Sequence, residues 1–313
     1  MRSSQGAIVQ KMRWTEWLLL CVLSVLWGGS FFFNAIAVRE LSPLTLLWGR
    51  TTLAAMALLV WVYVSGKQMP RSPQIWRSFI VMGVFNNAIP FSLIAWGQTS
   101  IDSGLAAILN ATTPVFGVIL AHFCTRDERL TRSRALGVSL SLLGVVVLMG
   151  SSVLRGLDVR NLGQLAVLTA ACSYAIASLY GRRFQAFPPA VTAAGMLTCT
   201  ATFSLPLVMF LDRPWTLNPA LATLGAVAGL ALIGTALSYL IFFRLLATAG
   251  ATNAMLVTFL IPVSALFLGA ILLEERIQIT ELAGMALIFA GLAAIDGRIF
   301  TAIARQPSIE TES

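Results

Sequence analysis

Two apolar stretches of the chain align when their prolines are superposed: GLAAILNATTP at residues 104–114 and TNAMLVTFLIP at residues 252–262. With one gap, the alignment continues downstream through three further matches: Glu128-Arg129-Leu130 with Glu275-Arg276-Ile277, Gly137 with Gly284, and Gly144 with Gly291. Upstream, Leu41-Ser42-Pro43 resembles Phe187-Pro188-Pro189. We therefore predict an internal repeat, with the second half of the chain a copy of the first.

Uncharged or nearly uncharged runs follow one another along the chain. Most reach the length of about 20 residues that a helix needs to cross a bilayer. Apolar residues follow one another without alternating with polar ones, which favours helices over membrane strands. We predict an all-α integral membrane protein with ten transmembrane helices, at residues 17–38, 41–66, 78–101, 103–125, 135–154, 161–181, 184–211, 214–243, 245–273 and 282–295. The last run is the shortest, and we expect it to include Thr280 and Glu281 as its first turn.

Each half of the chain holds five of these runs, and an odd number forces the two halves into opposite orientations in the membrane. Inverted repeats of this kind are typical of secondary carriers, which bind their substrate near the midplane between the halves. The predicted organisation is a cytoplasmic N-terminal segment at 1–16, a first repeat at 17–154, a second repeat at 161–296 and a cytoplasmic tail at 297–313.

The composition supports a membrane protein. Of the 313 residues, 58% are hydrophobic and 11% charged, with a mean hydropathy of +0.84, whereas a soluble domain has about 25% charged residues. The net charge of +8 does not indicate nucleic-acid binding, because the basic residues lie in short loops and form no continuous face. We expect the lipid bilayer and a small-molecule substrate as partners, no nucleic acid, and a monomer or weak dimer.

The distribution of Lys and Arg predicts the orientation. With the N-terminus in the cytoplasm, most of these residues fall in cytoplasmic segments and few in outside loops, as the positive-inside rule requires. The first run, 17–38, is too long for the core of a cleaved signal peptide and suits a retained span. We therefore predict a cytoplasmic (inner) membrane protein with both termini in the cytoplasm.

The chain shows no pattern of an enzyme, a metal site or a cofactor site. Its two lysines, Lys11 and Lys67, lie in no phosphate-binding loop, and the four cysteines have no ligand spacing. Every carboxylate falls at a helix end or in a loop, so the spans lack the acidic residue that proton-coupled carriers usually hold. His122, near the inner end of the fourth run, is either a coupling group or an interfacial side chain. We predict transport with weak or no ion coupling.

Several features together resemble a known family. They are Leu26-Trp27-Gly28-Gly29-Ser30-Phe31 in the first run, the prolines Pro114 and Pro262, and the Glu-Arg-(Leu/Ile) turn before a glycine-bearing last helix in each half. In this order they resemble the EamA repeat of the drug/metabolite transporter superfamily, over about residues 17–296. The second half departs from the pattern, with Ser173-Tyr174-Ala175 in place of Trp-Gly.

The resemblance implies a ten-helix secondary transporter that works by alternating access between two inverted bundles. Relatives include exporters of amino acids, among them YddG-type exporters of aromatic amino acids, so export of amino acids is the implied function. By the same analogy, Gly28 and Gly29 would form a hinge of the moving bundle.

Prolines interrupt four of the runs: Pro90, Pro114, Pro206 and Pro262. A proline cannot donate to the carbonyl four residues earlier. Those carbonyls belong to polar residues, namely Asn86, Asn110, Thr202 and Thr258. In a bilayer, a freed carbonyl needs a partner, and a substrate ammonium, a water or a neighbouring helix could supply it. The alternative for each proline is a packing kink without a ligand.

Amides and aromatic rings within the runs are further candidates for substrate contacts. Asn86, Asn87 and Asn110 offer donors for a carboxylate and an acceptor for an ammonium, or else they bond between helices. The deep aromatic residues Trp27, Tyr174 and Tyr239 either line a pocket or fill space. Arg50, two turns into the second run, either binds a substrate carboxylate or extends outward to the interface.

Other functions remain open at this stage. A carrier of sugar phosphates or nucleotide sugars would favour clustered Arg or Lys, and only Arg50 and Arg244 lie within spans. A drug carrier is a further possibility. An intramembrane enzyme would need a catalytic pair within the spans, and a sensor or assembly protein would not need the polar residues at mid-span.

Overall fold

The computed structural model describes residues 12–124, 131–150 and 158–296. Within these ranges the regular structure is entirely helical, and nine helices are long and apolar enough to cross a membrane. A tenth apolar helix, α13 (Val257–Leu272), is shorter. The predicted fold of ten membrane helices is confirmed. The predicted turn Glu128-Arg129-Leu130, the terminal segments 1–11 and 297–313, and residues 151–157, which include the end of the predicted fifth span, lie outside the described residues.

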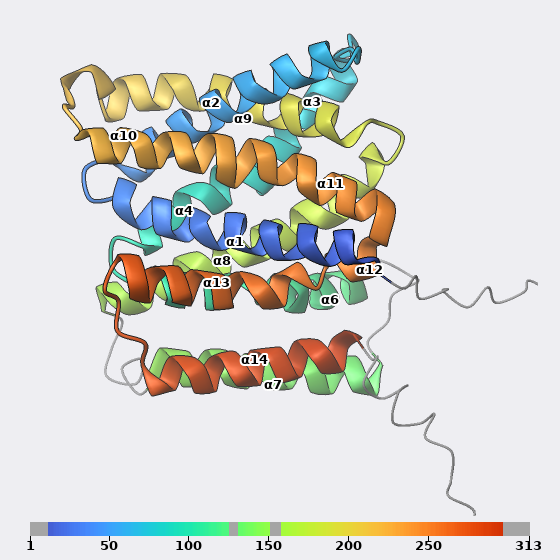
Figure 1. Cartoon of the computed structure of the whole chain (residues 1–313), viewed down its shortest axis with the longest axis vertical. Coiled ribbons are helices and arrows are strands. Elements are labelled where there is room, and N and C mark those ends of the chain that lie inside the picture. The colour runs from blue at the N-terminus through green and yellow to red at the C-terminus, as the bar shows by residue number, and fades with distance from the viewer. Residues whose placement is uncertain (1–11, 125–130, 151–157, 297–313) are drawn as a thin grey trace, which may run out of the picture.

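The two halves use the same succession of elements. The first comprises α1 (Trp14–Ala37), α2 (Pro43–Val64), a third span of α3 (Pro73–Gly83), the π-helix η1 (Val84–Ala88) and α4 (Ile89–Gly97), a fourth of α5 (Ser103–Asn110) and α6 (Thr113–Cys124), and α7 (Arg132–Met149). The second comprises α8 (Val159–Gly181), α9 (Pro189–Leu211), an eighth span of α10 (Leu221–Ala228), the π-helix η5 (Gly229–Leu237) and α11 (Ser238–Ala249), a ninth of α12 (Ala251–Ala254) and α13, and α14 (Ile279–Asp296). Figure 1 shows the helices stacked with their axes running from one side of the view to the other.

The boundary between the eighth and ninth spans differs from the sequence prediction. We expected the break after residue 243, but α11 continues to Ala249 and α12 begins at Ala251. Gly250 lies between them at φ +80°, a conformation that glycine adopts readily, and it turns the chain. Hydropathy could not locate this turn, because residues on both sides of it are apolar. The last helix does include Thr280 and Glu281, as expected.

The packing of α7 against α14 has the symmetry of an inverted repeat. A Cβ added at Gly144 would lie 2.7 Å from the carbonyl oxygen of Gly284, and one at Gly137 would meet Gly291 in the same way. In the sequence alignment Gly137 corresponds to Gly284 and Gly144 to Gly291. Gly144 therefore packs against the counterpart of Gly137, and Gly137 packs against the counterpart of Gly144. A two-fold relation produces this exchange. Figure 1 shows the two helices side by side at one edge of the bundle.

The helix α1 crosses α13 through Gly28. A Cβ at this position would lie 2.7 Å from Ser264 Cβ and 2.9 Å from the backbone nitrogen of Ala265, so only glycine permits this approach. At Gly29 the nearest atom is Leu268 Cδ1, at an ordinary 3.7 Å. Gly28 thus joins the first half of the chain to the second by close packing.

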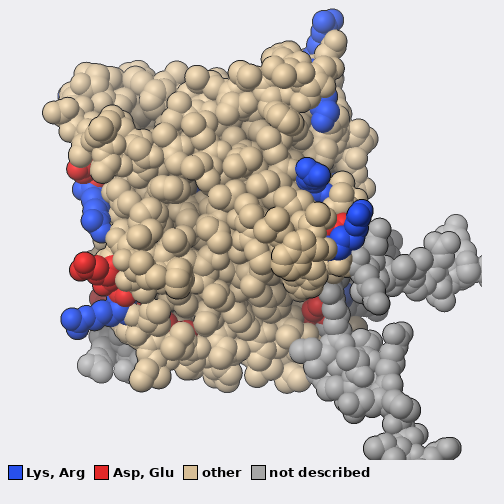
Figure 2. Space-filling model, viewed as in Figure 1, with Lys and Arg blue, Asp and Glu red and all other residues tan. Residues whose placement is uncertain are grey.

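The surface has the polarity of a membrane protein. Figure 2 shows Lys, Arg, Asp and Glu gathered at the two edges where the helices end, with an uncharged band between them on the face drawn. Large apolar side chains such as Val60, Phe210 and Phe267 are exposed along the helices. In water this surface would associate nonspecifically, whereas in a bilayer it faces lipid.

Candidate functional site

A cavity of about 330 Å³ lies between the two halves, within the size range of small-molecule sites. Its polar lining comes from both halves: Ser30, Asn34, Arg50, Asn86, Asn110, Thr113, Ser178, Thr235 and Thr258. Its aromatic lining is Trp27, Phe31, Phe91, Tyr174, Tyr239 and Phe242. The structure therefore brings together most of the residues that the sequence singled out as substrate contacts.

Both π-helices lie beside this cavity, at equivalent places in the third and eighth spans. In the third span, the Ile89 N–H bonds to the carbonyl of Val84, five residues back. Pro90 follows directly and has no N–H to continue the α-helical pattern. In the eighth span, the hydroxyls of Thr235 and Ser238 donate to carbonyls five residues earlier, each at 2.8 Å. Such π-helices occur frequently at functional sites.

The amides of Asn86 and Asn87 have different roles. Asn86 Nδ2 donates to the phenolic oxygen of Tyr239 at 2.9 Å, within the cavity lining. Asn87 is fully buried, and its Nδ2 donates to Thr200 Oγ1 of α9 at 3.2 Å. It does not line the cavity, because adjacent residues on a helix point in different directions. The structure assigns Asn87 a contact between helices.

Asn110 lines the cavity and holds an unsatisfied acceptor. Its side-chain Oδ1 is buried and has no hydrogen-bond partner among the described residues. Leaving such a group unpaired costs about 1–3 kcal/mol, which a ligand donor would recover. The backbone carbonyl of Asn110, which Pro114 leaves without its usual partner, accepts from Thr113 Oγ1 at 2.8 Å. The amide side chain, rather than the freed carbonyl, is thus the available group.

The candidate prolines lie around the cavity, not in it. Pro90 and Pro262 are buried among the helices, and Thr258, one turn before Pro262, lines the cavity. Pro114 lines a second cavity of about 340 Å³, which shares Ser178 with the central one. This second cavity includes Arg182 and lies at the end of the bundle where α1 begins.

Arg50 points into the cavity and does not extend to the end of its helix. Its Nε donates to Thr235 Oγ1 at 2.9 Å, and its Cζ lies 3.5 Å from the centroid of the Phe91 ring. Among the described residues that line the cavity, Arg50 is the one charged side chain. A charge at this depth costs about 3 kcal/mol by insertion scales, and the Phe91 ring offsets part of that cost.

Aromatic rings form much of the remaining wall. Trp27 and Phe242 pack with their centroids 5.3 Å apart, which joins α1 to α11. Tyr174, from the span that lacks the Trp-Gly pattern, lines the cavity as well. His122 is not among the lining residues and packs its ring against Phe123 near the end of α6, at 5.0 Å.

Buried polar contacts join neighbouring helices near the end of α1, on the side of the cavity away from the second one. Asn34 Nδ2 donates to Gln98 Oε1 at 2.7 Å, and Gln98 Nε2 donates to the carbonyl of Phe31 at 2.9 Å. Both amide side chains are buried. Polar side chains in an apolar run are a visible sequence signal, so both could have been noticed. Thr235 and Phe91 gave no such signal, since neither type is unusual in a membrane helix.

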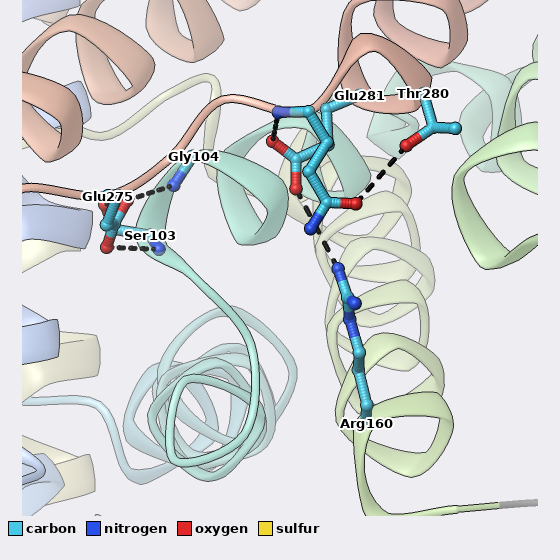
Figure 3. Close-up of polar contacts among 7 residues, drawn as sticks. Ser103, Gly104, Arg160, Glu275, Thr280 and Glu281 are labelled. Carbon is cyan, nitrogen blue, oxygen red and sulfur yellow. Dashed lines mark hydrogen bonds and ion pairs between the residues drawn. The ribbon is translucent and has the colours of Figure 1, made fainter.

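Beyond these amides, Glu275 ties the two halves together. Its carboxylate accepts from the backbone nitrogen of Ser103 at 2.9 Å, from Ser103 Oγ at 2.8 Å and from the backbone nitrogen of Gly104 at 3.4 Å (Figure 3). A carboxylate at a helix N-terminus is favourable. Partial desolvation, and next the nearby Glu275 carboxylate, raise the pKa of Asp102 above its usual value. Arg160 and Glu281 form a longer ion pair close by, at 4.0 Å (Figure 3).

Comparisons with known proteins agree with this arrangement. The model of the EamA-like transporter family matches residues 14–150 and again 161–295. A probable amino-acid metabolite efflux pump of Salmonella typhimurium is 27% identical over 88% of this chain and 92% of its own length. The uncharacterized transporter YoaV of Bacillus subtilis is 23% identical over 88% of this chain and 95% of its own. A solved crystal structure with 20% identity has the same fold, with a TM-score of 0.66 over 94% of this chain and 100% of that one.

Proposed function

This chain belongs to the EamA-like transporter family and is a multi-pass membrane transporter, not an enzyme, and we propose that it exports amino acids or related small metabolites across the cytoplasmic membrane. Two relatives, from Salmonella typhimurium and Escherichia coli, are named probable amino-acid metabolite efflux pumps, which supports both the substrate class and the direction. The direction depends on the substrate gradient, because a carrier without coupling is reversible.

The observation that carries the proposal is the central cavity. It lies between two halves with the symmetry of an inverted repeat, and it combines hydrogen-bonding side chains with aromatic rings. Contacts of Gln98 and Glu275 would hold one end closed, while the second cavity adjoins the central one toward the other end. In alternating access, a rocking of the two halves would open the closed end and close the adjoining one. The adjoining end would face the cytoplasm, with both termini on that side.

We assign the substrate contacts to residues of the cavity lining. The free Oδ1 of Asn110 would accept a hydrogen bond from an ammonium or hydroxyl group, with Thr258 at the equivalent place in the second half. The rings of Trp27, Tyr174 and Tyr239 would contact an apolar or aromatic side chain. Asn86 positions Tyr239 through their hydrogen bond.

Transport would run without proton coupling. Among the described residues of the cavity lining there is no Asp, Glu or His. His122 lies outside it, and Glu275 is occupied in capping α5. The substrate gradient would then drive transport. Uptake into liposomes driven by a pH gradient alone would contradict this part of the proposal.

Efflux from liposomes tests the function directly. Purified protein in liposomes loaded with a panel of labelled amino acids should release one or more of them faster than protein-free liposomes. Asn110→Ala should reduce this efflux about tenfold, because it removes the free acceptor. Gln164→Ala is the matched control, since Gln164 is also a buried amide with an unpaired oxygen but does not line the cavity. Release of a sugar phosphate but no amino acid would replace the proposed substrate class.

A further inference from the structure

The cavity lining holds the positive charge of Arg50 and, among its described residues, no negative charge to balance it. The Nε of Arg50 is bonded to Thr235 and its Cζ lies over the Phe91 ring. No ion pair to Arg50 is formed by the described residues, and neither of its Nη groups has a protein hydrogen bond among them. Four N–H donors and a full positive charge are thus available at the cavity wall.

Only one of the two repeats places a charged residue at this position. Arg50 follows Pro43 by the same number of residues as Met196 follows the aligned Pro189, so Met196 is its counterpart. Met196 is buried, and its Sδ lies 3.7 Å from Asn86 Nδ2. One half therefore contributes a cation to the midplane, and the other half contributes a neutral side chain at the matching place.

We infer that the cavity recognises its substrate mainly through a carboxylate bound to Arg50, and that an amino group on the substrate, whose hydrogen bond Asn110 would accept, adds affinity but is not required. The inference rests on the proposed transport function and deepens it. An anionic substrate would neutralise the cavity, whereas a zwitterion would leave the net charge at that of Arg50 alone. An ammonium group would find neutral acceptors such as Asn110, but no carboxylate among the described lining residues. Monocarboxylates without an amino group should therefore be substrates as well.

The surroundings of Arg50 favour a monoanion. Its guanidinium is stacked on a ring and held at Nε, which leaves a single edge for one planar carboxylate. A phosphate ester carries about two charges and is usually bound by several basic groups. The described lining provides only one. Cationic amines should be excluded, because they would place a like charge beside Arg50.

Four probes with one aromatic body test the inference on the unaltered protein. They are phenylalanine, 3-phenylpropionate, phenylalaninamide and 2-phenylethylamine, measured as competitors of labelled phenylalanine efflux and as stabilisers in thermal unfolding in detergent. The two carboxylates should compete and stabilise, and the amide and the amine should need about 10- to 100-fold higher concentration, as expected for loss of a charged hydrogen bond. Equal effects of phenylalanine and its amide, or no effect of 3-phenylpropionate, would overturn the inference while leaving amino-acid transport standing.

Variants then assign the effect to Arg50. Arg50→Gln should remove the difference between the acid and the amide, and Arg50→Lys should retain part of it. Arg244→Gln is the control, because Arg244 is exposed on α11 and does not line the cavity. An Arg50→Gln protein that folds and still prefers the acid would contradict the assignment. If no probe is transported but the two carboxylates stabilise the protein and the amide and the amine do not, the carboxylate site stands and the export function fails.

Discussion

The amide nitrogen of Asn86 donates to the phenolic oxygen of Tyr239 at 2.9 Å, which joins the third span of one repeat to the eighth span of the other. Asn86 lies within the π-helix η1, Tyr239 lies two residues after the π-helix η5, and both line the central cavity. The corresponding spans of the two halves thus meet through one hydrogen bond where the proposed substrate lies. Movement of one half against the other would alter this contact.

Removing the acceptor of this hydrogen bond should impair transport more than folding. In Tyr239→Phe the ring remains and the phenolic oxygen is lost, so Asn86 loses a net contribution of about 1 kcal/mol and a fixed orientation. We expect a severalfold lower efflux with a small change in thermal unfolding temperature. Tyr63→Phe is the control, because Tyr63 is exposed on α2. Unchanged efflux in Tyr239→Phe would separate this contact from transport.

The two adjacent glycines of α1 should respond differently to the same substitution. In Gly28→Ala, the new Cβ would lie 2.7 Å from Ser264 Cβ and 2.9 Å from the backbone of Ala265. The helices must then separate, at a cost of about 1–3 kcal/mol. In Gly29→Ala the nearest atom is at 3.7 Å, so the change should be tolerated. Thermal unfolding in detergent measures both, and equal stability of the two variants would show that α1 and α13 are not packed this closely.

Neutralising Glu275 should open the end of the cavity that it closes. Glu275→Gln weakens the charge-assisted bonds to Ser103 and Gly104, which are worth about 1.5–3 kcal/mol when a charged group is involved. We expect faster labelling of a cysteine placed at Ser30 by an impermeant thiol reagent, in a protein whose native cysteines have been replaced. Glu274→Gln is the control, since Glu274 is the adjacent residue and its side chain is exposed. Unchanged labelling would show that Glu275 stabilises the helix end alone.

The raised pKa of Asp102 predicts that the stability of the protein depends slightly on pH. Its pKa is raised in the folded protein, so its protonated form is the favoured one there. The contribution of this group to folding is present below its ordinary pKa and is lost as the pH rises through the raised value. Asp102→Asn should therefore be slightly more stable than the parent at pH 7, with the difference vanishing below about pH 4. The effect is small, because the side chain remains exposed. Thermal unfolding across this range measures it, and a variant less stable at pH 7 would reverse the assigned sign.

The candidate site was predictable in part. Trp27, Asn110 and Tyr174 lie in the cavity as the sequence suggested, since polar and aromatic groups deep in apolar runs are conspicuous. Asn87 carries the same signal as Asn86 but faces α9, and nothing in the sequence distinguishes the two. The sequence also does not determine whether the Arg50 side chain extends to the membrane interface or points into the cavity. Its direction depends on Thr235 and Phe91, which belong to other helices.

The sequence by itself determined the membrane fold, the ten spans and the inverted repeat. Lipid requires continuous apolar runs in which the backbone satisfies its own hydrogen bonds, so length and hydropathy are sufficient to count these runs, although not to find the turn at Gly250. Only the tertiary structure decided which face of each helix lines the cavity and where the helices approach most closely. These features depend on contacts such as Gly28 with Ser264 and Glu275 with Ser103, between residues far apart in the chain. Local pattern does not encode the rotation of one helix against another.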